Sequence, residues 1–170
     1  MLIAALAFGC MFTGCADPED DADVWSPVTS VNQLNGKWKG SYSETFSADE
    51  YYGEETGYEI NITTTEIIEM DVNVSSNTVT VKYTQVIKFS GKDVNSVWEL
   101  IKLSMGEDDD ATVNDSDKSI TYSGTESGSL SEFGDGGFED LEINQKGNKL
   151  RQQMGDEEKG NIRYMIFNKQ

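Results

Sequence analysis

Residues 58–74 read YEINITTTEIIEMDVNV, and their apolar side chains fall on alternate positions. Thr64 and Glu66 interrupt a row whose other even-numbered members are apolar or aromatic: Tyr58, Ile60, Ile62, Ile68, Met70, Val72 and Val74. Alternation with a period of two predicts a β-strand with one buried face. The stretch from Trp38 to Phe46 alternates in the same way, so the chain is expected to fold mainly as strands.

The rest of the chain carries this alternation in shorter pieces. Strands are predicted at about 36–46, 57–75 (one strand or two), 77–90, 96–105, 111–114, 118–124, 138–146, 148–155 and 160–168. Because successive strands are joined by short turns, the sequence predicts an all-β fold, a single antiparallel up-and-down β-barrel of about 8–10 strands. A closed barrel has no free strand edge, and one of about eight strands can hold a small ligand.

Three turns set the expected strand register. A two-residue loop at 116–117 places Val113 opposite Ile120 and Ala111 opposite Tyr122, which puts apolar residues on one face. A slip of one residue would move every side chain to the other face, so a coherent pairing is informative. Two further loops predict the following pairs: Ile143–Gln152 and Leu141–Met154 around Gly147-Asn148, and Val74–Val79 around Ser76-Asn77.

The segment 93–106, DVNSVWELIKLSMG, fits two structures. Four apolar residues have helical spacing: Val94, Val97, Trp98 and Ile101. Asp93 could cap such a helix and Gly106 could end it. A helix would leave Leu100 and Leu103 exposed, so we favour a strand here.

Composition limits the classes of function. The 170 residues suit one domain, with 36% hydrophobic residues and a net charge of −18. Such a polyanion is repelled by phosphate backbones, so nucleic-acid binding is not expected. The chain contains no histidine, which removes the usual general base and the commonest zinc ligand. We expect no enzymatic activity, no cofactor and no metal, and we expect a monomer.

The N-terminal stretch MLIAALAFGCMFTGC is apolar but shorter than the roughly 20 residues of a membrane-spanning helix. Its end, Gly14-Cys15, resembles the cleavage box of bacterial lipoprotein signal peptides, which implies that Cys15 is the lipidated residue. Phe12 stands where leucine is usual, and no positive charge follows Met1. Cys10 is the rival acceptor, and a buried apolar element is the alternative to a signal peptide.

Five acidic residues follow within nine positions of Cys15. A segment of this composition is expected to remain a solvated tether. It also resembles the surface-export signal of some Bacteroidetes lipoproteins, with a plain linker as the alternative. The predicted organisation is a signal peptide at 1–14, an acidic tether at 15–29 and a barrel at 30–170, anchored by lipid in the bacterial envelope at the outer membrane, with exposure on the cell surface left open.

The stretch LNGKW at residues 34–38 resembles the G-x-W motif that opens the first strand of calycins, the group that includes lipocalins, fatty-acid-binding proteins and avidins. The resemblance rests on Gly36, Trp38 and Arg163. In that family the tryptophan closes the barrel floor beneath an arginine of the last strand, which implies that Arg163 stacks on Trp38. It also implies a short 3₁₀ turn in the preceding TSVNQL, with Leu34 at the base of the barrel.

The favoured function is the binding of a small hydrophobic molecule inside a hollow barrel. The residues predicted to line it are apolar or tyrosine: Tyr42, Tyr58, Ile60, Ile62, Met70, Val72, Val81, Tyr83, Ile87, Phe89, Tyr122, Leu141 and Ile143. The alternative is that they fill an ordinary core. The protein would then be a non-enzymatic interaction protein of the envelope or cell surface, with a solid barrel and acidic loops.

Two further alternatives concern the acidic residues. Asp115, Asp117, Ser119 and Glu126 mimic the spacing of a calcium-binding EF-hand loop, but Ile120 stands where glycine is required, and a solvated loop is favoured. A pair of carboxylates could act as in glycosidases, but no two are singled out. An enzyme would require carboxylates clustered inside the barrel with perturbed pKa values.

Overall fold

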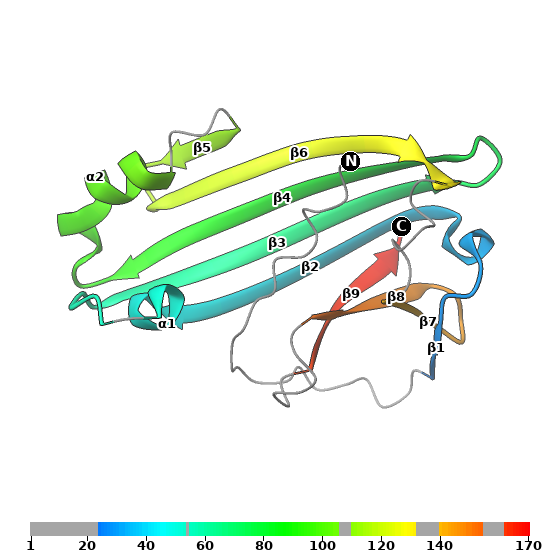
Figure 1. Ribbon diagram of the computed structural model, residues 1–170, viewed down its shortest axis with the longest axis horizontal. Coiled ribbons are helices and arrows are strands. Elements are labelled where there is room, and N and C mark those ends of the chain that lie inside the picture. The colour runs from blue at the N-terminus through cyan, green and yellow to red at the C-terminus, as the bar shows by residue number, and fades with distance from the viewer. Residues whose placement is uncertain (1–23, 54, 106–109, 132–139, 155–161) are drawn as a thin grey trace. The chain divides into compact units, whose positions relative to one another are not determined.

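A nine-stranded, mostly antiparallel sheet dominates the computed structural model, which describes residues 24–53, 55–105, 110–131, 140–154 and 162–170. The elements follow in the order β1 (Trp25–Pro27), η2 (a 3₁₀ helix, Val31–Leu34), β2 (Gly36–Ser47), α1 (Ala48–Tyr52), β3 (Ile60–Asn73), β4 (Thr78–Gly91), α2 (Val94–Met105), β5 (Ala111–Asn114), β6 (Ser119–Ser129), β7 (Leu141–Asn144), β8 (Lys149–Met154) and β9 (Arg163–Lys169). The predicted all-β class is confirmed (Figure 1).

The strands are ordered β1-β7-β8-β9-β2-β3-β4-β6-β5. Within the described residues the sheet is open, with β1 and β5 as its two edges, so the predicted closed barrel is wrong. Both edge strands are short: β1 has three residues and β5 has four. Short edge strands are one way in which open sheets limit unwanted edge-to-edge pairing.

The segment 94–105 is a helix, α2, so the predicted strand at 96–105 is wrong. Val94, Val97 and Trp98 are buried, as the helical spacing required, while Leu100 is 64% and Leu103 is 62% exposed. The argument for a strand assumed that these two leucines would be buried. The structure instead leaves them in solvent.

Two compact units divide the chain. The first comprises residues 1–41, 69–81 and 126–170, and the second comprises residues 42–68 and 82–125. The strands β2, β3, β4 and β6 contribute residues to both, because the boundaries fall inside them. Each unit has its own set of buried apolar side chains. The first buries Leu34, Trp38, Met70, Val72, Val79, Leu130, Leu141, Ile143, Leu150, Met165 and Phe167, and the second buries Phe46, Ile60, Ile62, Ile68, Ile87, Phe89, Val94, Val97, Trp98 and Ile120.

The predicted register of β5 and β6 is confirmed. Ala111 lies opposite Tyr122 and Val113 opposite Ile120. Lys118 has a φ of 56° in the turn between them. The predicted pairing therefore places the buried side chain of Ile120 correctly.

The predicted register of β7 and β8 is wrong by two residues. Ile143 lies opposite Leu150, and Leu141 opposite Gln152. The reason is a longer loop, 145–148, which the side chain of Asn144 closes. Its Oδ1 accepts hydrogen bonds from the backbone N–H groups of Asn148 and Lys149, each at 3.0 Å. Asn144 is only 2% exposed, and these bonds satisfy its oxygen.

The turn between β3 and β4 spans residues 74–77. Val74 therefore lies in the turn, whereas the prediction placed it in the strand opposite Val79. The Asn77 N–H donates to the Val74 carbonyl at 3.2 Å, and Asn77 has a φ of 55°. Asn73 completes the turn, because its Oδ1 accepts a hydrogen bond from the Ser76 N–H at 3.1 Å.

The predicted 3₁₀ turn before β2 is confirmed as η2. It presents the carbonyl of Leu34 to the indole of Trp38, whose Nε1–H donates a hydrogen bond to it at 2.7 Å. Trp38 is 1% exposed, and a buried indole N–H needs such an acceptor. Strand β9 pairs with β2 at this point, with Lys169 opposite Trp38.

Gly40 allows β9 to cover this core. It lies opposite Phe167, whose ring atoms would lie 2.7 Å from a Cβ at position 40. A side chain at this position would therefore displace the buried Phe167, which is 1% exposed. The glycine is required by close packing of the aromatic ring on the strand.

Replacing Trp38 by alanine should lower the free energy of unfolding by about 3–5 kcal/mol, the usual range for truncating a buried large aromatic side chain. The measurement is chemical denaturation followed by circular dichroism. Lys39→Ala is the matched control, because Lys39 is exposed in the same strand and forms only a surface ion pair with Glu69. A loss below about 1 kcal/mol for Trp38→Ala would contradict the burial of this indole.

Candidate functional site

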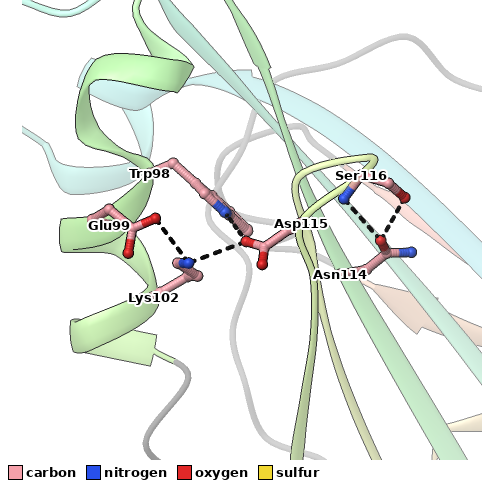
Figure 2. Close-up of polar contacts among 6 residues, drawn as sticks. All are labelled: Trp98, Glu99, Lys102, Asn114, Asp115 and Ser116. Carbon is pink, nitrogen blue, oxygen red and sulfur yellow. Dashed lines mark hydrogen bonds and ion pairs between the residues drawn. The ribbon is translucent and has the colours of Figure 1, made fainter.

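A cluster of polar side chains joins α2 to the turn between β5 and β6 (Figure 2). The indole Nε1–H of Trp98 donates a hydrogen bond to Asp115 Oδ1 at 2.6 Å. Lys102 Nζ lies 3.1 Å from the same oxygen and 2.8 Å from Glu99 Oε1. A fifth residue, Lys118, places its Nζ 5.2 Å from the centre of the Trp98 ring. Two lysines therefore compensate the acidic groups around one buried indole.

The local sequence explains why Asp115 faces the helix. Asn114 ends β5, and its Oδ1 accepts hydrogen bonds from the Ser116 N–H at 3.0 Å and the Ser116 hydroxyl at 2.7 Å. These bonds shape the turn and leave the side chain of Asp115 directed toward α2, as Figure 2 shows. Trp98 and Lys102 are four residues apart and therefore share one face of the helix.

The pKa of the Asp115 carboxyl is lowered, first by the hydrogen bond from Trp98 and then by the bond and charge of Lys102. The pKa of Lys102 is raised by Glu99 and Asp115. A second carboxyl with a lowered pKa is Asp49, which accepts hydrogen bonds from Thr56. In both carboxyls the bonds that lower the pKa also fasten a turn or loop. They therefore serve structure, unlike a catalytic acid, which needs a raised pKa.

The opposite face of α2 is apolar and exposed. Leu100 and Leu103 are three residues apart and lie on the same side of the helix. Among the described residues, they and Val24 are the most exposed large apolar side chains. Glu99 lies beside them with an 81% exposed side chain. This leucine pair, with Glu99 beside it, is the apolar part of α2 that faces solvent.

The side chains predicted to line a ligand cavity are distributed over three environments. Two are exposed, Tyr58 at 48% and Tyr83 at 39%, and three are half-buried: Tyr42, Val81 and Tyr122. The remaining eight are buried in the cores: Ile60, Ile62, Met70, Val72, Ile87, Phe89, Leu141 and Ile143. They are spread over both compact units, with Ile62 and Phe89 in the second and Leu141 in the first.

The three residues expected to close the barrel lie in β2 and β9, which pair with each other. Gly36 and Trp38 are in β2, and Arg163 begins β9. The cation over the Trp38 ring is Lys169, with its Nζ 5.0 Å from the ring centre. Arg163 lies at the other end of β9, opposite Met154. Lys169 thus has the position that the resemblance implied for Arg163.

Another arginine is enclosed by aromatic rings. The guanidinium carbon of Arg151 lies 4.8 Å from the ring centre of Trp25 and 4.1 Å from that of Tyr164. Arg151 Nε also donates a hydrogen bond to Glu142 Oε2 at 2.6 Å. These contacts join β1, β7, β8 and β9, so they fasten the short edge strand β1 to the sheet.

An open depression of about 610 Å³ lies where η2, the start of β2 and the end of β3 meet. Its lining combines polar and apolar surface and includes Asn35, Asp71 and Asn73. Val72, which was predicted to bind ligand, lines this depression, and so does Gly36, which was predicted to close the barrel. Sequence reasoning missed this site, since its residues belong to turns and strand ends and carry no motif.

Metal and membrane features are limited within the part of the chain that the structure describes. No group of three or more acidic or cysteine side chains is arranged to bind a metal ion there. The carboxylate of Asp115 is engaged by Trp98, and the Asp117 carboxylate accepts a hydrogen bond from the Ser119 hydroxyl. No helix of this part is long and apolar enough to cross a membrane. Cys15, the predicted lipidation site, lies outside the described residues.

A scan against models of protein families, a search of curated proteins and a search of solved structures each gave no match. Function must therefore be argued from the residues and their contacts.

The cluster on α2 predicts a pH dependence. A carboxyl with a lowered pKa stabilises the folded protein above its ordinary value of 3.8 and loses that contribution as the pH falls through its folded pKa. We expect lower hydrogen-exchange protection factors in α2 below about pH 4, together with a shift of the Trp98 indole N–H resonance. Asp115→Asn should remove this acid-dependent step, whereas Asp117→Asn should retain it. An unchanged acid dependence in Asp115→Asn would show that another group controls the helix.

Proposed function

We propose that the protein is a non-enzymatic interaction protein of the bacterial envelope, anchored by lipid at Cys15, which binds a protein partner through its outer surface. The observation that carries the proposal is the filled interior of the sheet. Eight of the thirteen side chains expected to surround a hydrophobic ligand are instead buried in the cores of the two compact units.

The exposed fractions of these side chains support this choice. Ile62 retains 1%, Val72 3% and Phe89 3% of their accessible surface. A side chain that borders a cavity large enough for water keeps accessible surface inside it, and a lipid-sized cavity would leave considerably more. Close packing at this level is the state of an ordinary protein core. The function favoured from the sequence, binding of a small hydrophobic molecule inside the barrel, therefore has less support.

The leucine pair of α2 supports a protein partner. Burying one leucine side chain contributes about 1.5–3 kcal/mol, so two adjacent leucines can form the centre of a contact. Glu99, which is paired with Lys102, lies beside the leucine pair, and the whole chain carries a net charge of −18. Charge complementarity therefore favours a partner with an apolar recess edged by lysine or arginine.

The same charge argues against two other occupants of the leucine pair. Two copies of a chain with net charge −18 repel each other, and two leucines per copy bury too little surface for a stable dimer. An anionic lipid surface is repelled as well. Lipidation at Cys15 supports a location in the envelope, because several acyl chains on one cysteine give a stable anchor.

The filled interior predicts that the protein does not take up apolar molecules. Native mass spectrometry of residues 16–170, incubated with palmitate, retinol and a phospholipid, should give the mass of the bare chain. Retinol-binding lipocalin under the same conditions serves as the positive control. A stable adduct released on denaturation would favour the hydrophobic-ligand function instead.

The leucine pair predicts a specific cross-link. A photoreactive residue at position 100, in the chain expressed in its own cells, should cross-link one cationic protein. The same residue at Asn95 should not, because five residues turn the helix by about 140° and point the probe elsewhere. Leu100→Ser with Leu103→Ser should weaken binding of the purified partner by about tenfold or more. A cross-link to a second copy or to lipid would contradict the proposed partner.

A further inference from the structure

The depression in the first unit has the chemistry of a ligand site that none of the preceding functions uses. It lies between η2 and the end of β3, with a volume of about 610 Å³. Three asparagines line it, Asn32, Asn35 and Asn73, together with Asp71 and Lys37. A volume of this size would accommodate a ligand of one or two sugar rings.

Two of the asparagine side chains are held in place by the fold. Asn35 Oδ1 accepts a hydrogen bond from the Val74 N–H at 3.1 Å. Asn73 Oδ1 accepts from the Ser76 N–H at 3.1 Å and from the Ser75 hydroxyl at 2.7 Å. Because each amide is fixed through its oxygen, its NH₂ group remains as an oriented donor. The entropic cost of arranging these donors is already met by folding.

Acceptors complement these donors. Lys37 Nζ lies 2.5 Å from Asp71 Oδ2, so Asp71 Oδ1 is the carboxylate oxygen not used in this ion pair. Within the described residues the side-chain amide of Asn32 has no hydrogen-bond partner, and it offers both a donor and an acceptor. Donors and acceptors therefore lie around one depression.

The charge of the site is balanced. Lys37 and Asp71 neutralise each other, and the other polar lining groups are amides and a hydroxyl. An anionic ligand would also meet the net charge of −18 of the whole chain. A cation would have to compete with Lys37 for Asp71. These conditions favour a neutral ligand.

We propose that this depression binds a neutral carbohydrate through vicinal hydroxyl groups. Each hydroxyl both donates and accepts a hydrogen bond, so adjacent hydroxyls match amide NH₂ donors placed beside a carboxylate oxygen. Val74, which is half-buried, also lines the depression and provides an apolar contact for the C–H face of a sugar ring. The site lacks an aromatic ring among its lining residues and is open to water, so affinity is modest, with a Kd of about 1–10 mM.

The test is a titration of the ¹⁵N-labelled chain with D-glucose, D-galactose, D-mannose and N-acetylglucosamine, each to about 100 mM, followed by NMR. At least one neutral sugar should shift the side-chain NH₂ resonances of Asn32, Asn35 and Asn73. Glucuronate and glucosamine, which carry a charge of either sign, should bind more weakly. This experiment is independent of α2 and of any protein partner.

Variants make the assignment specific. Asn32→Ala should weaken binding by about threefold and Asp71→Asn by about tenfold, in line with the loss of neutral and charged hydrogen bonds. Asn32 has no side-chain partner within the described residues, so its removal leaves the fold intact. Glu69→Gln is the matched control, because it breaks the neighbouring Lys39–Glu69 pair on the same two strands, outside the depression.

Several results would overturn the proposal. These are the absence of shifts with every neutral sugar, shifts confined to other parts of the chain, binding of a charged sugar as tight as that of the neutral ones, and equal losses in Glu69→Gln and Asn32→Ala. The wild-type titration alone decides the first three, so the proposal stays testable even where a variant folds poorly.

Discussion

Burial of the Trp38 indole constrains much of the first unit. Trp38 is the largest fully buried side chain of the described residues, and its N–H must find an acceptor away from water. The carbonyl of Leu34 satisfies it, and the 3₁₀ helix η2 holds that carbonyl in place. Ser30 and Gln33 cap η2 reciprocally, so the requirement of one indole extends back to the chain segment before the first long strand.

The open sheet changes what its residues can do. In a closed barrel the inward side chains would surround one ligand, but here eight of the thirteen lie buried in the cores of two compact units and the others reach the surface. Binding then depends on the outer surface, where chemically different features occur: the apolar leucine pair of α2 and the polar depression beside η2. Each belongs to one unit, so each can be altered by mutation without touching the other.

Sequence periodicity was sufficient to predict burial and register for strands whose two faces differ clearly in polarity. It placed the buried row from Ile60 to Val72 and the register of β5 with β6. It failed in β7 and β8, because the loop length there is set by hydrogen bonds from the Asn144 side chain, which strand alternation does not report. In α2 the helical spacing was present, but a strand was favoured because leucine was expected to be buried, whereas Leu100 and Leu103 are exposed.

The candidate sites were harder to predict than the fold. Asp115 and Trp98 are seventeen positions apart and meet only when α2 packs on the β5–β6 turn. The resemblance implied that Arg163 lies above Trp38, but the register of β9 gives that position to Lys169. The lining of the depression comes from three separate segments, and no local pattern joins Asn32 to Asn73.

The pairing of β2 with β9 also has a kinetic consequence. Trp38 lies opposite Lys169, so the two strands that enclose this core are separated by nearly the whole described chain. Closing so long a loop costs entropy before any contact is gained, and folds dominated by such non-local pairs form slowly. The first unit therefore cannot complete its core until the last strand has been synthesised.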